Sequence, residues 1–490
     1  MSSNNSDKQE DSPTKKVSQV MNNDILMEIM LYLDCHQIKR LERVSKQFRQ
    51  CGQYVTQHKI EAIAINDFIC LEYNRYLANK PIIYPIYKIP TNCFNRTDSE
   101  GFTFEDNEDT IVRLSEQFPK VRYISLAKYT PNYQKFVSFV NLFQHLDTLF
   151  IGCNTVEFTR YEFKQLGQLL SSRLKRFYYI CDKQSPNVIK CIKNLTQLET
   201  LLITLETKNC IIQLFKLLPS SVQFLHIHTP CNRSIRFDEQ LAQFLVDSRA
   251  KNIDTLYITP QFNAPALEII GQQMNLKTFL FSSLIETNQW KSLEELAKNQ
   301  KNLTYLGLKY HWFLNYRNTD KKISFPKVET LLLHFCCMDV LVFEGLLKSF
   351  QSMKTLILRK TAIRCIIDQR QHLEFSDCNT CFRHFYELVA KHTTIRKLVV
   401  HFEDLKDRTE VFCQTLNLMK YLRKIHLIRF CYDDHIDYYL LCQQLISDYI
   451  HYCHHNSDHK LFTFVIHNDI YLKIKSEIPR NIRILYNLYF

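Results

Sequence analysis

Apolar residues recur along most of this chain in one short pattern: an apolar residue, two others, a second apolar residue, one other, and a third apolar residue. Twelve such triads begin between residues 121 and 422, and successive triads start 23 to 31 residues apart, apart from one interval of 42. Apolar alternation over so few residues is typical of a short β-strand that packs one face against a core. We therefore predict one strand for each of these triads: Val121-Ile124-Leu126, Leu146-Leu149-Ile151, Leu174-Phe177-Tyr179, Leu198-Leu201-Ile203, Val222-Leu225-Ile227, Ile253-Leu256-Ile258, Leu276-Phe279-Phe281, Leu303-Leu306-Leu308, Val328-Leu331-Leu333, Met353-Leu356-Leu358, Ile395-Leu398-Val400 and Leu422-Ile425-Leu427.

The segments between the triads carry the period of a helix. In residues 237–247, for example, Asp238 is suited to cap a helix on which Leu241, Phe244 and Leu245 share one face. One strand–helix unit of this length cannot bury its apolar face, whereas stacked copies share a continuous core. The period matches that of leucine-rich repeats, about 20 to 29 residues. We predict an α/β fold in which a curved leucine-rich-repeat solenoid carries a parallel sheet on its concave face and helices outside.

These patterns divide the chain into five segments. The first is polar throughout and lacks the apolar content to bury a core, so we expect it to be disordered. A short helical module and a proline-containing connection follow, and then the repeats. The predicted segments are 1–20 (disordered), 21–60 (helical module), 61–110 (connection), 111–466 (solenoid of about 12 to 13 units, with Leu461-Phe464-Ile466 as a thirteenth strand) and 467–490 (C-terminal cap).

The segment 21–60 has apolar residues at three- and four-residue steps, which predicts short amphipathic helices. We expect six of these residues to share one face of the first helix, and Ser45 to cap a later helix that starts at Lys46. About forty residues bury little core on their own, so this module should need a partner surface. The first helix carries Met21, Ile25, Leu26, Ile29, Met30 and Leu33, and the second run is Ile38, Leu41, Val44 and Phe48.

This segment resembles the F-box family, whose pattern runs L-P-x-E-I-L, two spacers, I, then Y-L, and later L-x-x-V-S-K-x-F-R. Residues 41–49 match the second part closely, whereas Asn22 stands at the usual proline and Asp24 at the usual glutamate. The resemblance implies binding to a Skp-type adaptor and, through it, to a cullin scaffold. The alternative is a helical hairpin that packs on its own chain. The adaptor-binding residues implied by the resemblance are Met21, Ile25, Leu26, Ile29, Leu33, Ile38, Leu41, Val44 and Phe48.

One side chain in each strand, between the second and third apolar residues of the triad, should point to the concave face. We predict that this column forms an exposed aromatic and aliphatic stripe that binds a protein substrate. The alternative is that a long loop or the C-terminal tail covers it. Basic residues beside this column favour an acidic, hydrophobic target segment, namely Arg122, Lys175, Arg176 and Lys277. The column consists of Ser125, Phe150, Tyr178, Leu202, His226, Tyr257, Leu280, Gly307, Leu332, Ile357, Val399 and His426. The predicted substrate-binding residues are Phe150, Tyr178, Leu202, His226, Tyr257 and Leu280.

The composition and motifs of the chain argue against several classes of function. The formal net charge of +12 is spread along the chain, and a general compositional bias accounts for this excess of basic residues. The alternative function is a solenoid that binds nucleic acid, and its affinity would fall steeply with salt. Seven glycines, with no phosphate-binding loop, argue against nucleotide enzymes. No HExxH, GxSxG or paired CxxC motif occurs, so we expect no enzyme and no cofactor. The polar N-terminus and the lack of a long apolar run predict no membrane span and a cytoplasmic or nuclear location.

Two clusters of cysteine and histidine are the candidates for a metal site. A single C-x-x-C pair, Cys378 and Cys381, is only half of a zinc site, and histidines in a polar segment are usually solvated. We therefore predict no metal at either cluster. The first cluster contains Cys365, His372, Cys378, Cys381 and His384, and the second contains His451, Cys453, His454, His455 and His459.

The sequence thus favours the substrate-recognition subunit of a cullin-based ubiquitin ligase, in which residues 21–60 bind the adaptor and the repeats bind the target. The alternative is a leucine-rich-repeat scaffold without ubiquitin transfer, which the substitution at Asn22 favours.

Overall fold

The computed structural model describes part of the chain, and structural statements below refer to that part. The predicted disordered segment 1–20 and the histidine cluster at 451–459 lie outside it. The described residues are 23–31, 40–41, 43–58, 62–65, 86–89, 95–97, 101–103, 116, 119–127, 133–153, 158–181, 186–229, 235–283, 289–309, 312–313, 323–334, 336–359, 361–364, 379–401, 405, 408–416, 418–428, 444, 463–467 and 483–487.

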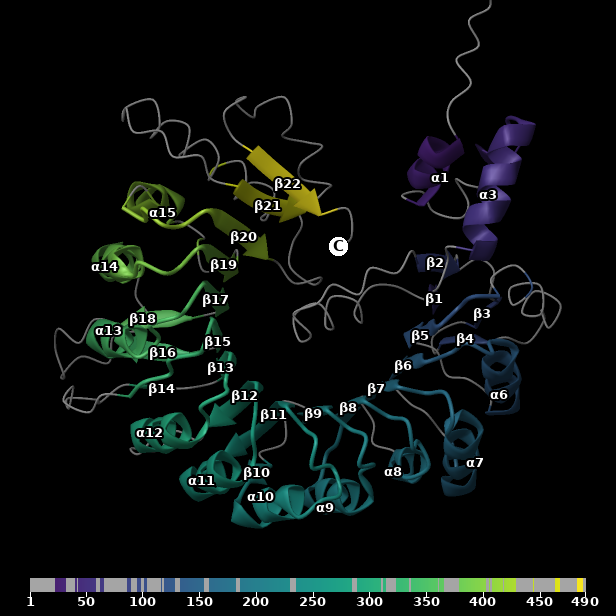
Figure 1. Ribbon diagram of the computed structural model, residues 1–490, viewed down its shortest axis with the longest axis horizontal. Helices are drawn as coiled ribbons and strands as arrows, with labels where there is room; N and C mark the ends of the chain where they lie inside the picture. The colour runs from purple at the N-terminus through teal and green to yellow at the C-terminus, as the bar shows by residue number, and fades with distance from the viewer. Residues whose placement is uncertain are drawn as a thin grey trace, which may run out of the picture.

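One long parallel sheet dominates the structure. Seventeen strands of the described residues belong to it, and over most of its length each strand pairs with the next one along the chain. Figure 1 shows these strands lining the inner side of a curved array. The order given by the pairings is β2 (Ile86–Ile89), β1 (Ala62–Ile65), β5 (Tyr123–Ala127), β6 (Thr148–Cys153), β7 (Arg176–Cys181), β8 (Thr200–Thr204), β9 (Phe224–His228), β11 (Thr255–Phe262), β12 (Thr278–Ser283), β13 (Tyr305–Lys309), β15 (Thr330–His334), β17 (Thr355–Arg359), β19 (Lys397–His401), β20 (Lys424–Ile428), β21 (Thr463–His467) and β22 (Arg483–Asn487), with β10 (Arg236–Phe237) beside the end of β11.

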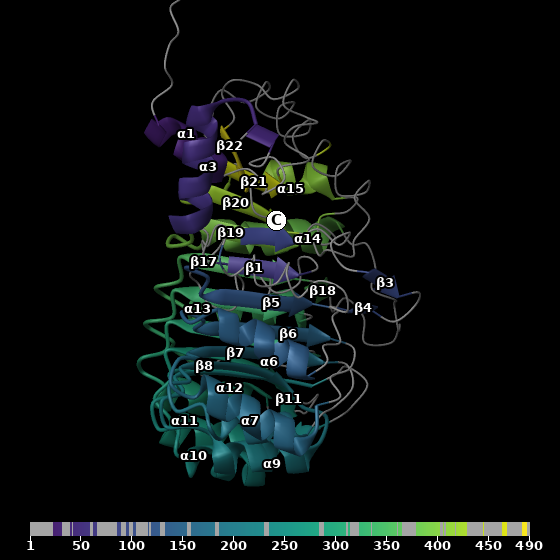
Figure 2. The ribbon, with the colours of Figure 1, turned by 90° about the vertical axis from the view of Figure 1, so that its right-hand side faces the viewer.

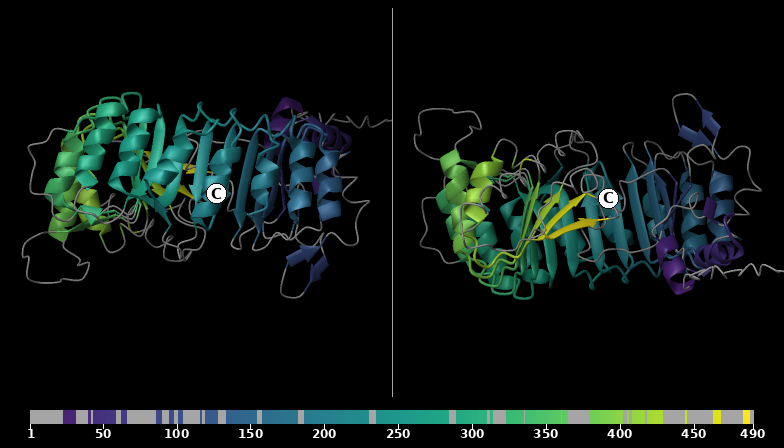
Figure 3. Two further views of the ribbon diagram at one scale, coloured as in Figure 1. Left: turned by 90° about the horizontal axis from the view of Figure 1, so that it is seen from below. Right: turned by 90° about the horizontal axis from the view of Figure 1, so that it is seen from above.

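Helices cover the outer side of the curve, as Figure 1 and both panels of Figure 3 show. Most follow a strand and return the chain to the start of the next strand, which is the connection that parallel strands require. These helices are α6 (Tyr133–Leu142), α7 (Arg160–Leu170), α8 (Val188–Ile192), α9 (Lys208–Leu217), α10 (Glu239–Val246), α11 (Ala264–Gln273), α12 (Gln289–Asn299), α13 (Val340–Lys348), α14 (Asn379–Lys391) and α15 (Thr409–Leu416).

The strands form where the apolar triads predict them. In all twelve predicted units the second and third apolar residues lie on a strand, in the predicted order, and β21 confirms the thirteenth triad. The triads and the inner faces of the helices form one hydrophobic core that runs from Val121 to Ile425. The array therefore shares a single core between neighbouring units, because no unit could bury its apolar face alone.

Side-chain caps begin several of the helices. Asp238 accepts a hydrogen bond from the backbone N–H of Leu241 (3.2 Å) at the start of α10, as predicted, and Leu241 and Leu245 are buried. Thr159 and Glu162 form a reciprocal capping box at the start of α7. Such caps satisfy N–H groups that the first helical turn leaves unpaired, and each contributes about 1 kcal/mol to helix stability.

A repeated backbone contact links the units just before each strand. The N–H groups of Asp147 and Thr148 both donate to the carbonyl oxygen of Arg122, at 3.0 and 2.9 Å. The same double contact recurs from unit to unit as far as Lys424, whose N–H, with that of Arg423, donates to the carbonyl of Arg396. The side view in Figure 2 shows the resulting stack of strands. The contact sets the register that aligns equivalent side chains in columns across the sheet.

The sheet extends beyond the repeat range 111–466 that the triads predict. Strands β1 and β2 come from the predicted connection and continue the sheet at one end, and β22, within the predicted cap, continues it at the other. A short antiparallel hairpin, β3 (Asn95–Thr97) and β4 (Gly101–Thr103), lies to one side of the stack in Figure 2. A second parallel sheet contains β14 (Trp312–Phe313), β16 (Cys337–Asp339) and β18 (Ala362–Arg364).

Candidate functional site

The N-terminal module is built from two helices, α1 (Asn23–Leu31) and α3 (Lys46–His58), at the end of the array that holds β1 and β2 (Figure 1). The Ser45 hydroxyl accepts a hydrogen bond from the N–H of Phe48 (3.2 Å), so α3 begins at Lys46 as predicted. Asn23 accepts a hydrogen bond from the side-chain amide of Gln47 (2.7 Å), which ties the start of α1 to α3.

A small core holds the two helices together. Leu26 and Met30, one turn apart on α1, pack with Cys51 and Val55, one turn apart on α3, and all four are at most 3% exposed. Side chains spaced by one turn lie on the same face of a helix, so the two pairs meet along one short contact.

Two apolar residues of the predicted adaptor-binding set face outward. Ile25 is 54% exposed and Val44 is 67% exposed, although both belong to the predicted adaptor-binding set. The expectation that Ile25 and Leu26 share one helix face is therefore wrong. Adjacent residues are about 100° apart on a helix, and the small core shared with α3 lies on the side of Leu26 and Met30.

The remaining predicted adaptor-binding residues divide into three groups. Leu41 and Phe48 are partly buried against the small core. Ile29 lies on α1, but its side chain is not described, and Met21, Leu33 and Ile38 lie outside the described residues. Adaptor binding by the whole set stays a prediction.

The second candidate surface is the inner face of the sheet. The strand register places Phe150, Tyr178, Leu202, His226 and Tyr257 next to one another. The column predicted from the triads therefore exists, and Leu280 continues it through its pairing with Tyr257.

The predicted exposure of this column is wrong. The six predicted substrate-binding side chains are buried, with exposed fractions of 0 to 7%. Part of the reason lies within the sheet: the Phe150 ring lies over Gly152, and Leu280 lies over Gly307, so neighbouring glycines make room for large side chains. Substrate binding by these residues stays a prediction, but they do not form an exposed stripe. Further along the column, Leu332 and Ile357 are partly exposed.

Aromatic and histidine side chains pack edge to face on this inner surface. The Tyr257 ring lies 5.2 Å from Phe224 and 5.6 Å from His226, both nearly perpendicular. Burial, with smaller effects from His228 and Lys309, lowers the pKa of His226 well below its ordinary value, and burial followed by Lys309 lowers the pKa of His228 to about 4. Both imidazoles are therefore neutral at physiological pH and act as packing groups.

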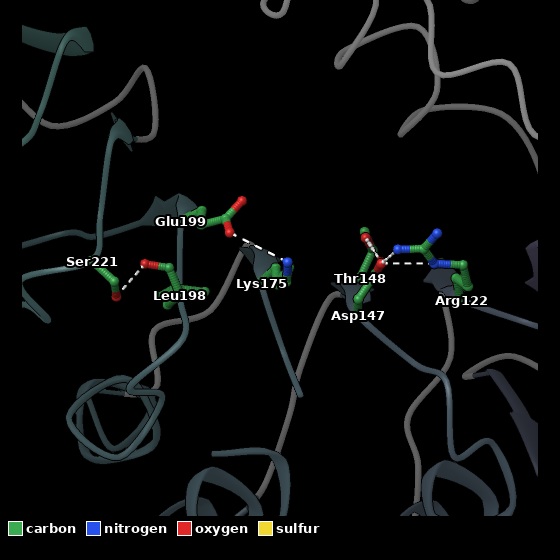
Figure 4. Close-up of polar contacts among 7 residues, drawn as sticks. All are labelled: Arg122, Asp147, Thr148, Lys175, Leu198, Glu199 and Ser221. Carbon is green, nitrogen blue, oxygen red and sulfur yellow. Dashed lines mark hydrogen bonds and ion pairs between the residues drawn. The ribbon is translucent and has the colours of Figure 1, made fainter. Parts of the chain in front are cut away.

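A line of mostly charged residues precedes the strands, and we call it the rim column. Arg122 forms an ion pair with Asp147, and Lys175 with Glu199 (3.6 Å), each in the next unit along the array; Figure 4 shows both pairs. The rim column consists of Arg122, Asp147, Lys175, Glu199, Gln223, Asp254, Lys277, Thr304, Glu329, Lys354, Arg396 and Arg423.

Ion pairs engage Arg122, Lys175 and Lys277, which the sequence predicts, together with Arg176, to favour an acidic target, and that preference stays a prediction. Lys277 is also paired, with Asp254 at 2.8 Å. Exposed pairs such as Lys175 with Glu199 contribute little to stability, about 0 to 1 kcal/mol, but each carboxylate neutralises the charge that a partner would meet. Nothing in the sequence pattern identifies these pairs, because the partners are about one repeat apart.

Within the described part of the chain, no group of three or more histidine, cysteine or carboxylate residues is arranged to hold a metal ion. Cys365, His372 and Cys378 of the first candidate cluster lie outside that part, as does the whole second cluster. Burial raises the pKa of the Cys191 thiol well above its ordinary value, so this thiol is a core group. No described helix is long and apolar enough to span a membrane.

Similarity to known proteins does not assign this chain to a family. No family model matches the chain, and no curated protein matches it. Among solved structures, it is similar to the crystal structure of a complex of Rad7 and Elc1 in yeast. The identity is 13%, the likeness covers 57% of this chain and 80% of that chain, and the TM-score is 0.33. A TM-score this low carries no conclusion about the present chain.

Proposed function

We propose that this protein is a non-enzymatic substrate-recognition subunit of a cullin-based ubiquitin ligase. Residues 21–60 act as an F-box that binds a Skp-type adaptor, and the leucine-rich repeats bind the target protein. Ubiquitin transfer is then promoted by proximity, because a tethered target meets the ubiquitin-charged partner at a high effective concentration.

The observation that carries the proposal is the exposure of Ile25 and Val44 on a module that already has its own core. Both positions match apolar residues of the F-box pattern, and residues 41–49 match it throughout. A helical hairpin serving only its own chain would bury such residues against a neighbouring element. Exposed apolar side chains on a small module instead favour a partner surface.

The test is capture of a purified Skp-type adaptor by the full chain. Burying an isoleucine or valine contributes about 1.5 to 3 kcal/mol, and more than half of each side chain is still available in the free chain. Ile25→Asp combined with Val44→Asp should therefore weaken adaptor binding by about 30-fold or more. Because both side chains are exposed, far-ultraviolet circular dichroism should be unchanged.

The matched control is Leu418→Asp, which replaces a side chain that is 51% exposed but lies at the other end of the array. It should leave adaptor binding intact. Failure of the wild-type chain to capture the adaptor would overturn the proposal. Capture without ubiquitin transfer to any bound protein, in a reconstituted cullin ligase, would support the scaffold alternative instead.

A further inference from the structure

The alternation of charge along the rim column stops near its C-terminal end. From Arg122 to Lys354 the basic residues pair with carboxylates of neighbouring units, and the last pair joins Lys354 to Glu329. The next two members of the column, Arg396 and Arg423, are both basic. Neither forms a salt bridge with any described residue.

Two lysines stand beside these arginines. Lys397 on β19 and Lys424 on β20 are in register, so their side chains leave the inner face of the sheet about 5 Å apart. Both are half-buried, and neither forms a salt bridge with a residue that the structure describes. Burial, followed by the charge of Lys424, lowers the pKa of Lys397. Like charges placed side by side on a sheet are destabilising, and the free chain bears that cost.

The position of Arg396 is fixed by its own contacts. Its guanidinium donates hydrogen bonds to the carbonyl oxygens of Thr393 (2.7 Å) and Ile395 (3.3 Å) and lies over the ring of Tyr421, 5.2 Å from the ring centroid. An arginine held in this way loses little side-chain entropy when a partner binds.

We propose that Arg396, Lys397, Arg423 and Lys424, which we call the basic patch, bind an acidic, carboxylate-rich segment of a partner protein. Carboxylates would offset the repulsion between the lysines and supply the ion pairs that the rest of the rim column makes internally. The proposal concerns binding only and does not depend on ubiquitin transfer.

The surroundings favour a protein segment over a nucleic acid. A phosphate backbone running along the array would leave the basic patch and meet rim residues whose charges are already paired, at Asp147, Glu199, Asp254 and Glu329, so it would gain little attraction there. A short acidic segment can instead stay within two strands. The partly exposed Leu332 and Ile357 lie on the strands that lead to the basic patch, where they can meet apolar residues of the same segment.

The test is fluorescence anisotropy of the full chain with a labelled oligoglutamate peptide of about ten residues. Lys397→Gln combined with Lys424→Gln should weaken binding by about 10-fold at physiological salt. The matched control, Lys175→Gln with Lys277→Gln, removes the same charge from paired rim residues. Lys277 lies four strands from Lys397, about 19 Å away, which exceeds the screening length of about 8 Å. This control should therefore bind normally.

A thermal melt of the single variant Lys424→Gln provides a second readout. Replacing Lys424 with glutamine should raise the unfolding midpoint, because it removes the repulsion on Lys397. Equal losses of peptide binding in the two double variants would show a general charge effect and overturn the proposal. The proposal would also fail if neither double variant changed peptide binding. A third contrary result would be a single-stranded oligonucleotide of about 20 nucleotides that competes better than the peptide and loses affinity in the Lys397 and Lys424 variant.

Discussion

Gly167 on α7 lies at a close contact between two neighbouring units. A Cβ atom at this position would lie 2.4 Å from the carbonyl oxygen of Cys191, on α8, and 2.9 Å from its Cα atom. Ordinary contact begins near 3.4 Å, so Gly167→Ala would push the α8 backbone about 1 Å away. The nearest atoms are all backbone atoms of Cys191, which cannot rotate aside as a flexible side chain can.

The expected cost follows from two opposing effects. Overpacking a close contact costs about 1 to 3 kcal/mol. Alanine in the interior of a helix is better than glycine by about 0.5 to 1 kcal/mol. We therefore expect Gly167→Ala to destabilise the array by about 1 kcal/mol, within a range of about 0 to 2.5 kcal/mol. A Cβ atom at Gly345 on α13 would have no described residue within 4 Å apart from its sequence neighbours and the backbone of its own helix, so Gly345→Ala should stabilise the protein by about 0.5 to 1 kcal/mol.

Urea unfolding followed by circular dichroism measures both changes, and hydrogen exchange shows where each change acts. Protection should fall in α7 and α8 for Gly167→Ala, because repeat arrays lose stability locally at the interface that is disturbed. If Gly167→Ala stabilised the protein as much as Gly345→Ala does, the close packing of α7 on α8 would be refuted.

Two further predictions concern the inner face. The pKa of His228 is about 4 in the folded chain against 6.5 for an ordinary histidine, so the unfolded chain binds the proton preferentially. The stability contributed by His228 should be complete above pH 6.5 and lower by about 1 kcal/mol at pH 5.5. Urea titrations across that pH range should show a flatter dependence for His228→Asn. Tyr257 is fully buried, so Tyr257→Ala should lower the free energy of unfolding by about 3 to 5 kcal/mol, whereas an unchanged stability would indicate that this side chain is free to meet a partner.

The sequence by itself determined the strands and their order. Each triad is a local signal, because alternation over six residues decides which side chains of one strand enter the core. The cap of α10 at Asp238 and the start of α3 after Ser45 are local in the same way, since a cap contacts residues only two or three positions away. Such features need no knowledge of the rest of the fold.

The exposure of the inner column was decided only by the tertiary structure. The triads place Tyr178 and Tyr257 on the inner face, but their burial depends on side chains of neighbouring strands and on space such as that above Gly152 and Gly307. The outward position of Ile25 likewise depends on which side of α1 meets α3.

The charged residues can be read from the sequence, but their ion pairs depend on the tertiary structure. The sequence shows Arg122 and Lys175 as basic residues, yet their carboxylate partners come from the next unit, 25 and 24 residues further along the chain. Only the register of the stacked strands brings those groups together, and only that register leaves Lys397 beside Lys424. Local periodicity is written in the sequence, whereas pairing across repeats depends on distances that exist only once the units stack.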